Sequence, residues 1–198
     1  MERKITHIAG VDEAGRGPLA GPVAVGMVVV PVDFDWGLLP RVGDSKKVSA
    51  ENREAIFCRA RALSRAGQLS YAVSLVGSST IDRIGITKAV ALGIKRTFQK
   101  LSPDPLYTKV LLDGLLHAPE EFLEQQTIIK GDAKEKVIGL ASICAKVTRD
   151  THMVRVARDH PLYHFDIHKG YGTKKHIEAI RTYGLSPIHR KSFTKRFQ

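Results

Sequence analysis

The sequence predicts an α/β fold in which strands and helices pack as layers. Short apolar runs alternate with longer segments of helical spacing, which is typical of this class. The composition is that of an ordinary globular protein, with 43% hydrophobic and 26% charged residues. A length of 198 residues favours one domain with a substantial core.

The first half of the chain predicts the order strand, strand, helix, strand. Residues 5–12 form an apolar run that ends at two acidic residues, and 22–31 form a buried strand bounded by prolines. After a loop, Ser49 is a favourable helix N-cap with acidic residues in the next turn, and Gly67 ends that helix. Residues 69–76 predict the third strand.

The second half adds further helices and two strands. Residues 79–101 predict one or two helices, with a glycine as the break, and 108–113 predict a strand that ends in an acid. A shorter strand covers 126–130. A long helix covers 134–159, where small residues allow close packing on a sheet and a His-Pro pair follows. Residues 174–183 form a short helix between a threonine cap and a glycine stop.

The charge balance indicates a polyanionic partner such as nucleic acid. Lysine and arginine number 31 against 20 acidic residues, which gives a formal net charge of +11 and a pI of about 9.8. On charge alone, a soluble protein that happens to be basic remains an alternative.

The chain shows no sign of export or membrane insertion. Its N-terminus leads into a strand and lacks a signal-peptide core, and the longest apolar run is too short to span a bilayer. Cys58 and Cys144 have no zinc spacing and fall in apolar helical patterns, which predicts buried, reduced thiols. We therefore expect a cytoplasmic protein without membrane contact.

Acidic residues stand at the ends of three predicted strands: Asp12 and Glu13, Asp113, and Asp132. Strand ends of one sheet can converge, and carboxylates suit hard divalent cations. Together the four acids could hold two Mg²⁺ or Mn²⁺ ions about 4 Å apart. Taken singly, an acid such as Asp113 before a glycine is a common solvated turn residue.

A glycine turn, Gly15-Arg16-Gly17, follows the first acidic pair directly. Such a turn lets backbone N–H groups approach a sugar or phosphate closely. Its spacing to Gly21 differs from the dinucleotide-binding fingerprint. The preceding carboxylates would also repel a pyrophosphate, so we exclude that function.

Two basic segments are candidates for substrate contact. Lys46 and Lys47 follow an Asp-Ser pair and could neutralise backbone phosphates without recognising sequence. Lys169 and Tyr171 precede a predicted helix and could contact phosphate and sugar. A solvated basic loop and a surface turn with a packed tyrosine are the respective structural alternatives.

These segments resemble, in order, the motifs of the type 2 ribonucleases H, and of bacterial ribonuclease HII in particular. The opening Gly-Val-Asp-Glu-Ala-Gly-Arg-Gly and the later His-Lys-Gly-Tyr are similar to family motifs. The matching stretches are 10–17, 44–47, 111–114, 130–132, 141–150, 168–171 and 189–193.

The resemblance implies an α/β, ribonuclease H-like mixed sheet flanked by helices. It implies one catalytic domain over residues 1–198, in which about 160–198 form a helical C-terminal extension over the substrate groove. The implied metal ligands and catalytic residues, with two Mg²⁺ or Mn²⁺ ions as cofactors, are Asp12, Glu13, Asp113 and Asp132. The implied substrate contacts are Gly15, Arg16, Gly17, Lys46, Lys47, Lys169 and Tyr171.

The implied activity is hydrolysis of the phosphodiester 5′ to ribonucleotides, in RNA–DNA hybrids and at single ribonucleotides in duplex DNA. It leaves 3′-hydroxyl and 5′-phosphate ends and serves to remove ribonucleotides from DNA, with the protein acting as a monomer. The glycine turn would sense the ribose 2′-hydroxyl, and Tyr171 the sugar on its 3′ side.

Two departures from the family pattern are Lys191, where an arginine is usual, and His164, where glycine is common. Lys191 is expected to weaken bidentate contacts. Asp150 is expected to form a structural ion pair with a neighbouring base. Two alternatives stay open: a same-fold nuclease with another substrate, such as hybrids only or branched DNA, and a non-catalytic nucleic-acid-binding protein.

Overall fold

A mixed five-stranded sheet forms the centre of the computed structural model, which describes residues 4–42 and 48–197. The strand order is β3-β2-β1-β4-β5. Strands β1, β2 and β3 are antiparallel neighbours, whereas β4 runs parallel to both β1 and β5. The strands are β1 (His7–Ala14), β2 (Val23–Pro31), β3 (Ser70–Val76), β4 (Thr108–Asp113) and β5 (Gln125–Ile128).

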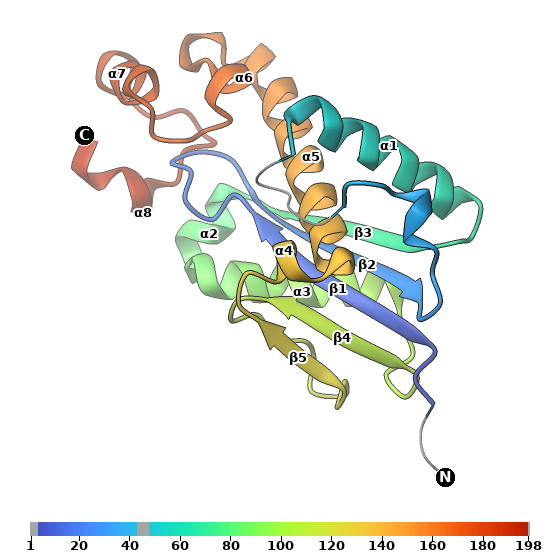
Figure 1. Ribbon diagram of the computed structural model, residues 1–198. Coiled ribbons are helices and arrows are strands. Elements are labelled where there is room, and N and C mark those ends of the chain that lie inside the picture. The colour runs from blue at the N-terminus through green and yellow to red at the C-terminus, as the bar shows by residue number, and fades with distance from the viewer. Residues whose placement is uncertain (1–3, 43–47, 198) are drawn as a thin grey trace.

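Helices cover both faces of this sheet (Figure 1). Helices α1 and α5 lie on one face, α2 and α3 on the other, and α6, α7 and α8 gather near the C-terminal end of α5. The α/β fold with a mixed sheet and flanking helices is therefore confirmed. The helices are α1 (Ala50–Arg65), α2 (Ser78–Ile84), α3 (Ile86–Leu101), α4 (Gly131–Lys134), α5 (Lys136–Asp159), α6 (Phe165–His168), α7 (Lys174–Tyr183) and α8 (Lys191–Thr194).

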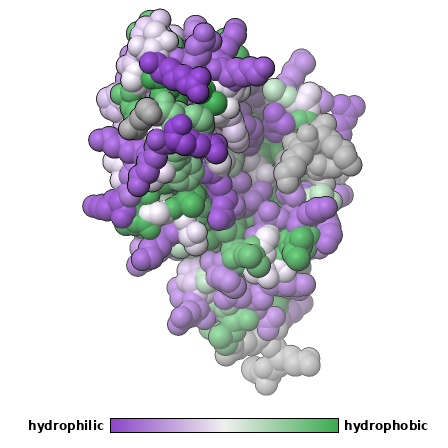
Figure 2. All heavy atoms as spheres, turned by 90° about the vertical axis from the view of Figure 1, so that its left-hand side faces the viewer, coloured by the Kyte–Doolittle hydropathy of each residue, from purple (hydrophilic) through white to green (hydrophobic). Residues whose placement is uncertain are grey.

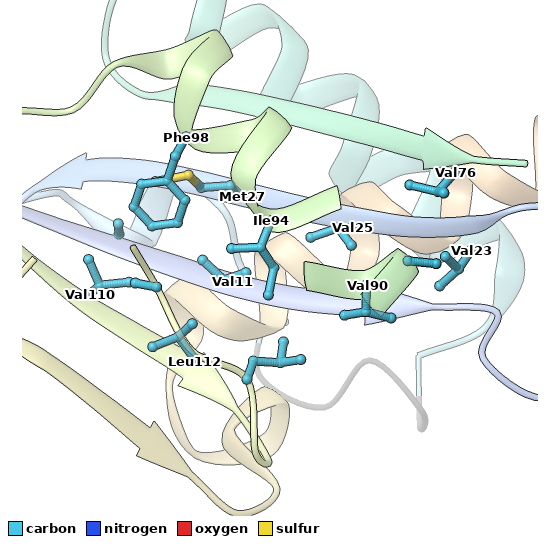
Figure 3. Packing of buried hydrophobic residues seen from close by; sticks show 14 of the residues in the cluster. Val11, Val23, Val25, Met27, Val76, Val90, Ile94, Phe98, Val110 and Leu112 are labelled. Atoms are coloured by element: carbon cyan, nitrogen blue, oxygen red, sulfur yellow. The ribbon is translucent and has the colours of Figure 1, made fainter. Parts of the chain in front are cut away.

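An apolar layer on each face holds the helices to the sheet. Figure 3 shows Val11 of β1 and Leu112 of β4 with Ile94 and Phe98 of α3 in one cluster. A second cluster on the opposite face includes Leu111 of β4 and residues of α1 and α5. Because side chains alternate along a strand, the residue that follows Val11 faces α5.

Glycines in the sheet allow α5 to lie unusually close. A Cβ atom at Gly10 would overlap the backbone of Val137, and one at Gly26 would overlap the carbonyl of Ala141. The small residues predicted on this helix therefore serve close packing, as expected. The close approach also places α5 over the acidic end of β1.

The terminal signals of the helices were predicted well. The Ser49 hydroxyl accepts a hydrogen bond from the N–H of Asn52 at 3.2 Å, and Thr173 accepts one from the N–H of His176 at 3.3 Å. Gly85 has φ +81° and separates α2 from α3. None of the helices in the described ranges is long and apolar enough to cross a membrane.

Three expectations need correction. Strand β1 continues through the acidic pair to Ala14, because its partner β2 extends the pairing to Ala24. The predicted helix 134–159 is found as α5 but begins at Lys136, since Glu135 is extended and Lys134 ends the separate helix α4. Cys58 lies exposed on α1, whereas Cys144 is buried as predicted, and burial raises its pKa to about 12.

Candidate active site

Parallel pairing brings the acidic ends of β1 and β4 to one level of the sheet. Val11 of β1 pairs with Leu112 of β4, and the next residues of the two strands are Asp12 and Asp113. The Asp12 side chain is buried, and burial raises its pKa to about 8. The negative charges of Glu13 and Asp113 add to this increase. The topology therefore places three carboxylates in one electrostatically coupled group.

Donors from the protein compensate part of this unfavourable charge. The side chain of Ser142 on α5 hydrogen-bonds to Asp12, and the backbone N–H of Glu13 donates to Asp12 Oδ1 at 2.7 Å. The pKa of Glu13 is also raised by burial, and the Arg16 guanidinium, at 3.2 Å, opposes that shift. Ser142 is one of the small residues that the sequence predicted to serve helix packing, and its contact with Asp12 was not predicted.

The turn after β5 brings Asp132 toward the same end of β4. Lys130 adopts a left-handed conformation with φ +57°, and the N–H of Gly131 donates to Asp113 Oδ1 at 2.7 Å. A Cβ atom at Gly131 would lie 2.7 Å from Ile138 Cδ1, so a larger residue here would displace that side chain. Asp132 follows directly and is buried in the first turn of α4.

The acids carry the donor type that a hard divalent cation prefers. Among residues 4–42 and 48–197, no three acidic, histidine or cysteine side chains form a ready-made metal cluster. Burial raises the pKa of Asp12, and the charges of Glu13 and Asp113 raise it further; a cation among these carboxylates would offset both effects. The oxygen donors thus fit Mg²⁺ or Mn²⁺, while the four-acid ligand set stays a prediction.

The glycine turn lies immediately beside the acids, in the loop between β1 and β2 (residues 15–22, the β1–β2 loop). Gly15 is buried with φ +88°, whereas Arg16 and Gly17 are exposed. A Cβ atom at Gly17 would meet no atom within 4 Å, so the backbone there is open to a ligand. The turn is therefore placed to contact a molecule bound at the carboxylates.

A buried arginine from the C-terminal segment holds this turn. Arg190 donates from Nη2 to the carbonyl of Gly15 at 2.7 Å, from Nη1 to that of Arg16 at 2.7 Å, and from Nε to that of Gly21 at 2.9 Å. Its side chain is fully buried, and burial lowers its pKa to about 9. Three charge-assisted hydrogen bonds thus fix the backbone of the β1–β2 loop.

Arg149 of α5 holds the other end of the same loop. It donates from Nε to the carbonyl of Pro22 at 2.8 Å and from Nη2 to that of Ala20 at 3.2 Å. Arg149 stands seven residues after Ser142, two turns along the same face of the helix. That spacing places Arg149 on the same face as Ser142 but does not indicate its partners in the loop. Asp150 pairs with Lys146 at 3.0 Å, as predicted.

The substrate-contact candidates of the second basic segment lie against the β1–β2 loop. The carbonyl of Gly170 accepts a hydrogen bond from the N–H of Leu19 at 2.8 Å. Tyr171 is partly exposed, with Lys146 Nζ at 5.5 Å from its ring centroid. Lys169 donates to the carbonyl of Asp166. Lys46 and Lys47 lie outside the described residues.

Three buried histidines support this segment through a network that was not predicted from the sequence. His176 donates from Nδ1 to the carbonyl of Tyr171 at 2.9 Å, and its Nε2 lies 3.0 Å from His189 Nε2. His189 Nδ1 accepts from the N–H and the hydroxyl of Ser186 at 2.9 and 2.8 Å. His168 stacks on His176 with ring centroids 4.4 Å apart. Burial lowers the pKa of His176 and of His189 to about 4, so the network is neutral at pH 7.

The two departures from the family pattern do not disturb the acids. The N–H of Lys191 donates to Asp82 at 2.9 Å, while the guanidinium contacts with the β1–β2 loop come from Arg190. The contacts with the loop therefore do not depend on Lys191, and its expected weakening of bidentate contacts stays a prediction. His164 is exposed and has φ +53°, the left-handed conformation that glycine adopts most readily.

The surface around the C-terminal helices is basic and polar. Figure 2 shows mostly hydrophilic side chains on this face, with smaller hydrophobic areas between them. Such a surface suits the phosphate backbone of a nucleic acid. Its exposed cations include Lys174, Lys175, Arg181, Lys191, Lys195 and Arg196.

Comparison with known proteins gives one consistent result. The family model described as Ribonuclease HII matches residues 9–196. The Ribonuclease HII of Endomicrobium trichonymphae is 45% identical over 188 residues, which cover 94% of this chain and 85% of the relative.

Solved structures agree with the sequence match. The ribonuclease H2 from Pyrococcus horikoshii OT3 has a TM-score of 0.69 and 26% identity, over 96% of this chain and 98% of that chain. Bst-RNase HIII, solved in complex with Mn²⁺, has a TM-score of 0.70 and 18% identity, over 92% of this chain and 64% of that chain. At that identity the second likeness shows the fold alone.

Proposed function

The chain belongs to the ribonuclease HII family, and from this premise we propose which bond it cuts and how. As a ribonuclease H it is a hydrolase. The proposed reaction is endonucleolytic hydrolysis 5′ to a ribonucleotide, in RNA–DNA hybrids and at single ribonucleotides within duplex DNA. The observation that carries this proposal is the pairing of β1 with β4, which places Asp12 and Asp113 beside the exposed glycine turn.

The four acids, Asp12, Glu13, Asp113 and Asp132, would hold two divalent cations. Mg²⁺ and Mn²⁺ match their oxygen donors, and Bst-RNase HIII was solved with Mn²⁺. When bound, such ions activate a water and stabilise the oxygen that leaves phosphorus. Asp12 would lose its proton as a cation binds, because its raised pKa keeps the isolated carboxyl protonated at pH 7. Ser142 would keep that carboxylate oriented.

The β1–β2 loop would select the ribonucleotide. Gly17 has open space at its backbone, and Arg16 is held near the acids by its ion pair with Glu13. Backbone groups of Gly15, Arg16 and Gly17 would then contact the ribose 2′-hydroxyl, the group that separates RNA from DNA. Tyr171 would pack on the following sugar. Both contacts depend on a rigid backbone, which the buried arginines supply.

The basic C-terminal surface would position the duplex across the site. Lysines such as Lys169, together with Lys46 and Lys47 of the sequence before α1, would neutralise phosphates without recognising sequence. The region from about residue 160 would serve as the extension that covers the substrate groove. The products would carry 3′-hydroxyl and 5′-phosphate ends, and the cellular role would be removal of ribonucleotides from DNA.

A panel of three substrates tests the proposal. The protein is incubated with Mg²⁺ or Mn²⁺ and a duplex with one ribonucleotide, an RNA–DNA hybrid, or an all-DNA duplex. We expect cleavage of the first two, loss of cleavage with chelator, and none of the third. Cleavage of the hybrid alone would overturn the recognition of single ribonucleotides. Tight binding without any cleavage would favour a non-catalytic nucleic-acid-binding protein.

A further inference from the structure

A single buried side chain, Arg149, contacts both elements that are proposed to recognise the substrate sugars. Its Nε and Nη2 hold the carbonyls of Pro22 and Ala20 in the β1–β2 loop. Its Cζ lies 5.7 Å from the ring centroid of Tyr171. A Cβ atom at Gly15 would overlap its Nε and Cδ atoms, so the guanidinium lies directly against the glycine turn.

Stability alone does not explain a cation at this position. The Arg149 side chain is fully buried, and burial lowers its pKa. Within the described part of the chain its Nη1 has no hydrogen-bond partner, and Asp150 Oδ1 lies 3.9 Å away. A buried charge with incomplete pairing is costly, and a well-packed apolar residue is often neutral or stabilising in its place. The position therefore indicates a role in the substrate-facing loops.

We propose that Arg149 is a positioning residue that fixes the separation between the glycine turn and Tyr171. This inference rests on the proposed function. A duplex with one ribonucleotide offers one register in which the ribose meets the turn while the next deoxyribose meets Tyr171. An RNA–DNA hybrid presents a 2′-hydroxyl at every position, so misaligned loops still find a productive register. Arg149 thus supports recognition of the isolated ribonucleotide more than cleavage of the hybrid.

Arg190 provides a matched comparison within the same loop. It holds the carbonyls of Gly15 and Arg16, but the ring it lies over belongs to Phe193, at 5.2 Å, and not to Tyr171. Weakening the hydrogen bonds of Arg190 by substitution should therefore lower cleavage of the single-ribonucleotide duplex and of the RNA–DNA hybrid to a similar extent. Arg158, exposed in the last turn of α5, is the control for an arginine-to-lysine substitution on the same helix.

The experiment compares Arg149→Met, Arg149→Lys, Arg190→Lys and Arg158→Lys with the wild type. For each protein, kcat and KM are measured on a duplex with one ribonucleotide and on an RNA–DNA hybrid. We expect both Arg149 variants to lower the ratio of kcat/KM for the first substrate over the second at least tenfold. Arg190→Lys should leave that ratio within about twofold, and Arg158→Lys should leave both rates unchanged.

Coupling through Tyr171 gives a second readout that a purely structural role would not move. In an Arg149→Lys background, Tyr171→Ala should change the substrate ratio less than twofold, although Tyr171→Ala alone changes it strongly. An unchanged ratio in the Arg149 variants, with both rates reduced equally, would overturn the inference. If Arg149→Met fails to fold, the inference is judged on the ratio of kcat/KM for the two substrates in Arg149→Lys. Failure of the wild type to cut either substrate would instead overturn the proposed function.

Discussion

The buried histidine network is expected to contribute less to the stability of the protein at pH 5 than at pH 7. Burial lowers the pKa of His176 and His189 to about 4, and an unfolded histidine has its pKa near 6.5. Between these values the unfolded chain binds more protons than the folded protein. Stability is therefore fully present above pH 6.5 and is lost as the pH falls toward 4.

The size of this effect follows from the two pKa values. A difference of one pKa unit corresponds to ~1.36 kcal/mol, so the full shift amounts to ~3.4 kcal/mol for one histidine. Between pH 7 and pH 5 the linkage relation gives ~2 kcal/mol per group. Since the two rings share one hydrogen bond, we expect the pair to contribute about 2 to 4 kcal/mol over this interval.

Chemical unfolding of wild type and variant at pH 7, 6 and 5 measures this loss. The contribution of Asp12 to the free energy of unfolding changes with pH in the opposite direction. Because its pKa is raised, that contribution grows as the pH falls below about 8. Comparing each variant with the wild type cancels that contribution. His176→Asn can still donate to Tyr171 but does not titrate, so it should lose at least ~1 kcal/mol less than the wild type. The control is His117→Asn at an exposed site.

An equal pH dependence in wild type and His176→Asn would refute this reasoning. Because His176 bonds to the carbonyl of Tyr171, acid should also loosen the substrate-facing segment first. Hydrogen exchange at residues 168–172 would show that loosening as increased exchange at pH 5.

Three further predictions follow from single contacts. Ser142→Ala removes a hydrogen bond to Asp12 and should weaken Mn²⁺ binding by about 10–100-fold, measured by calorimetry; unchanged affinity would contradict the role of that contact. Gly26→Ala places a methyl group against the backbone of α5 and should destabilise the protein by ~1–3 kcal/mol in urea unfolding. Gly77→Ala, where no atom lies within 4 Å, should change stability far less. Lys174→Gln should reduce the salt dependence of duplex binding, lowering the magnitude of the slope of log K against log salt by ~0.9. An unchanged slope would mean that the duplex does not contact Lys174.

Local signals explain why most elements were predictable. Ser49 and Thr173 cap their helices through side-chain oxygens, and Gly85 breaks a helix through its positive φ, all of which depend on near neighbours. The end of β1 was not predictable in the same way. Its last residues stay in the sheet because β2 continues beside them, and no local pattern near Glu13 reports that pairing.

The same contrast between local signals and contacts from distant segments applies to the candidate site. The four acids could be proposed because carboxylates at strand ends have a recognisable chemistry. The buried arginines could not, since Arg149 contacts a carbonyl 127 positions away and Arg190 one 175 positions away. Sequence spacing gives no measure of such distances in the fold. Each of these side chains becomes interpretable only when the β1–β2 loop is seen enclosed between α5 and the C-terminal segment (Figure 1).

The most direct test of the central claim maps the cut in a duplex that carries one ribonucleotide. Wild type and Asp113→Asn are compared with Mg²⁺ or Mn²⁺, beside an all-DNA duplex. The account predicts one wild-type cut, 5′ to the ribonucleotide, with a 5′-phosphate on the downstream product, and a loss of more than ~100-fold in the variant. Full metal-dependent cutting by Asp113→Asn, or an equal rate on all-DNA duplex, would contradict it.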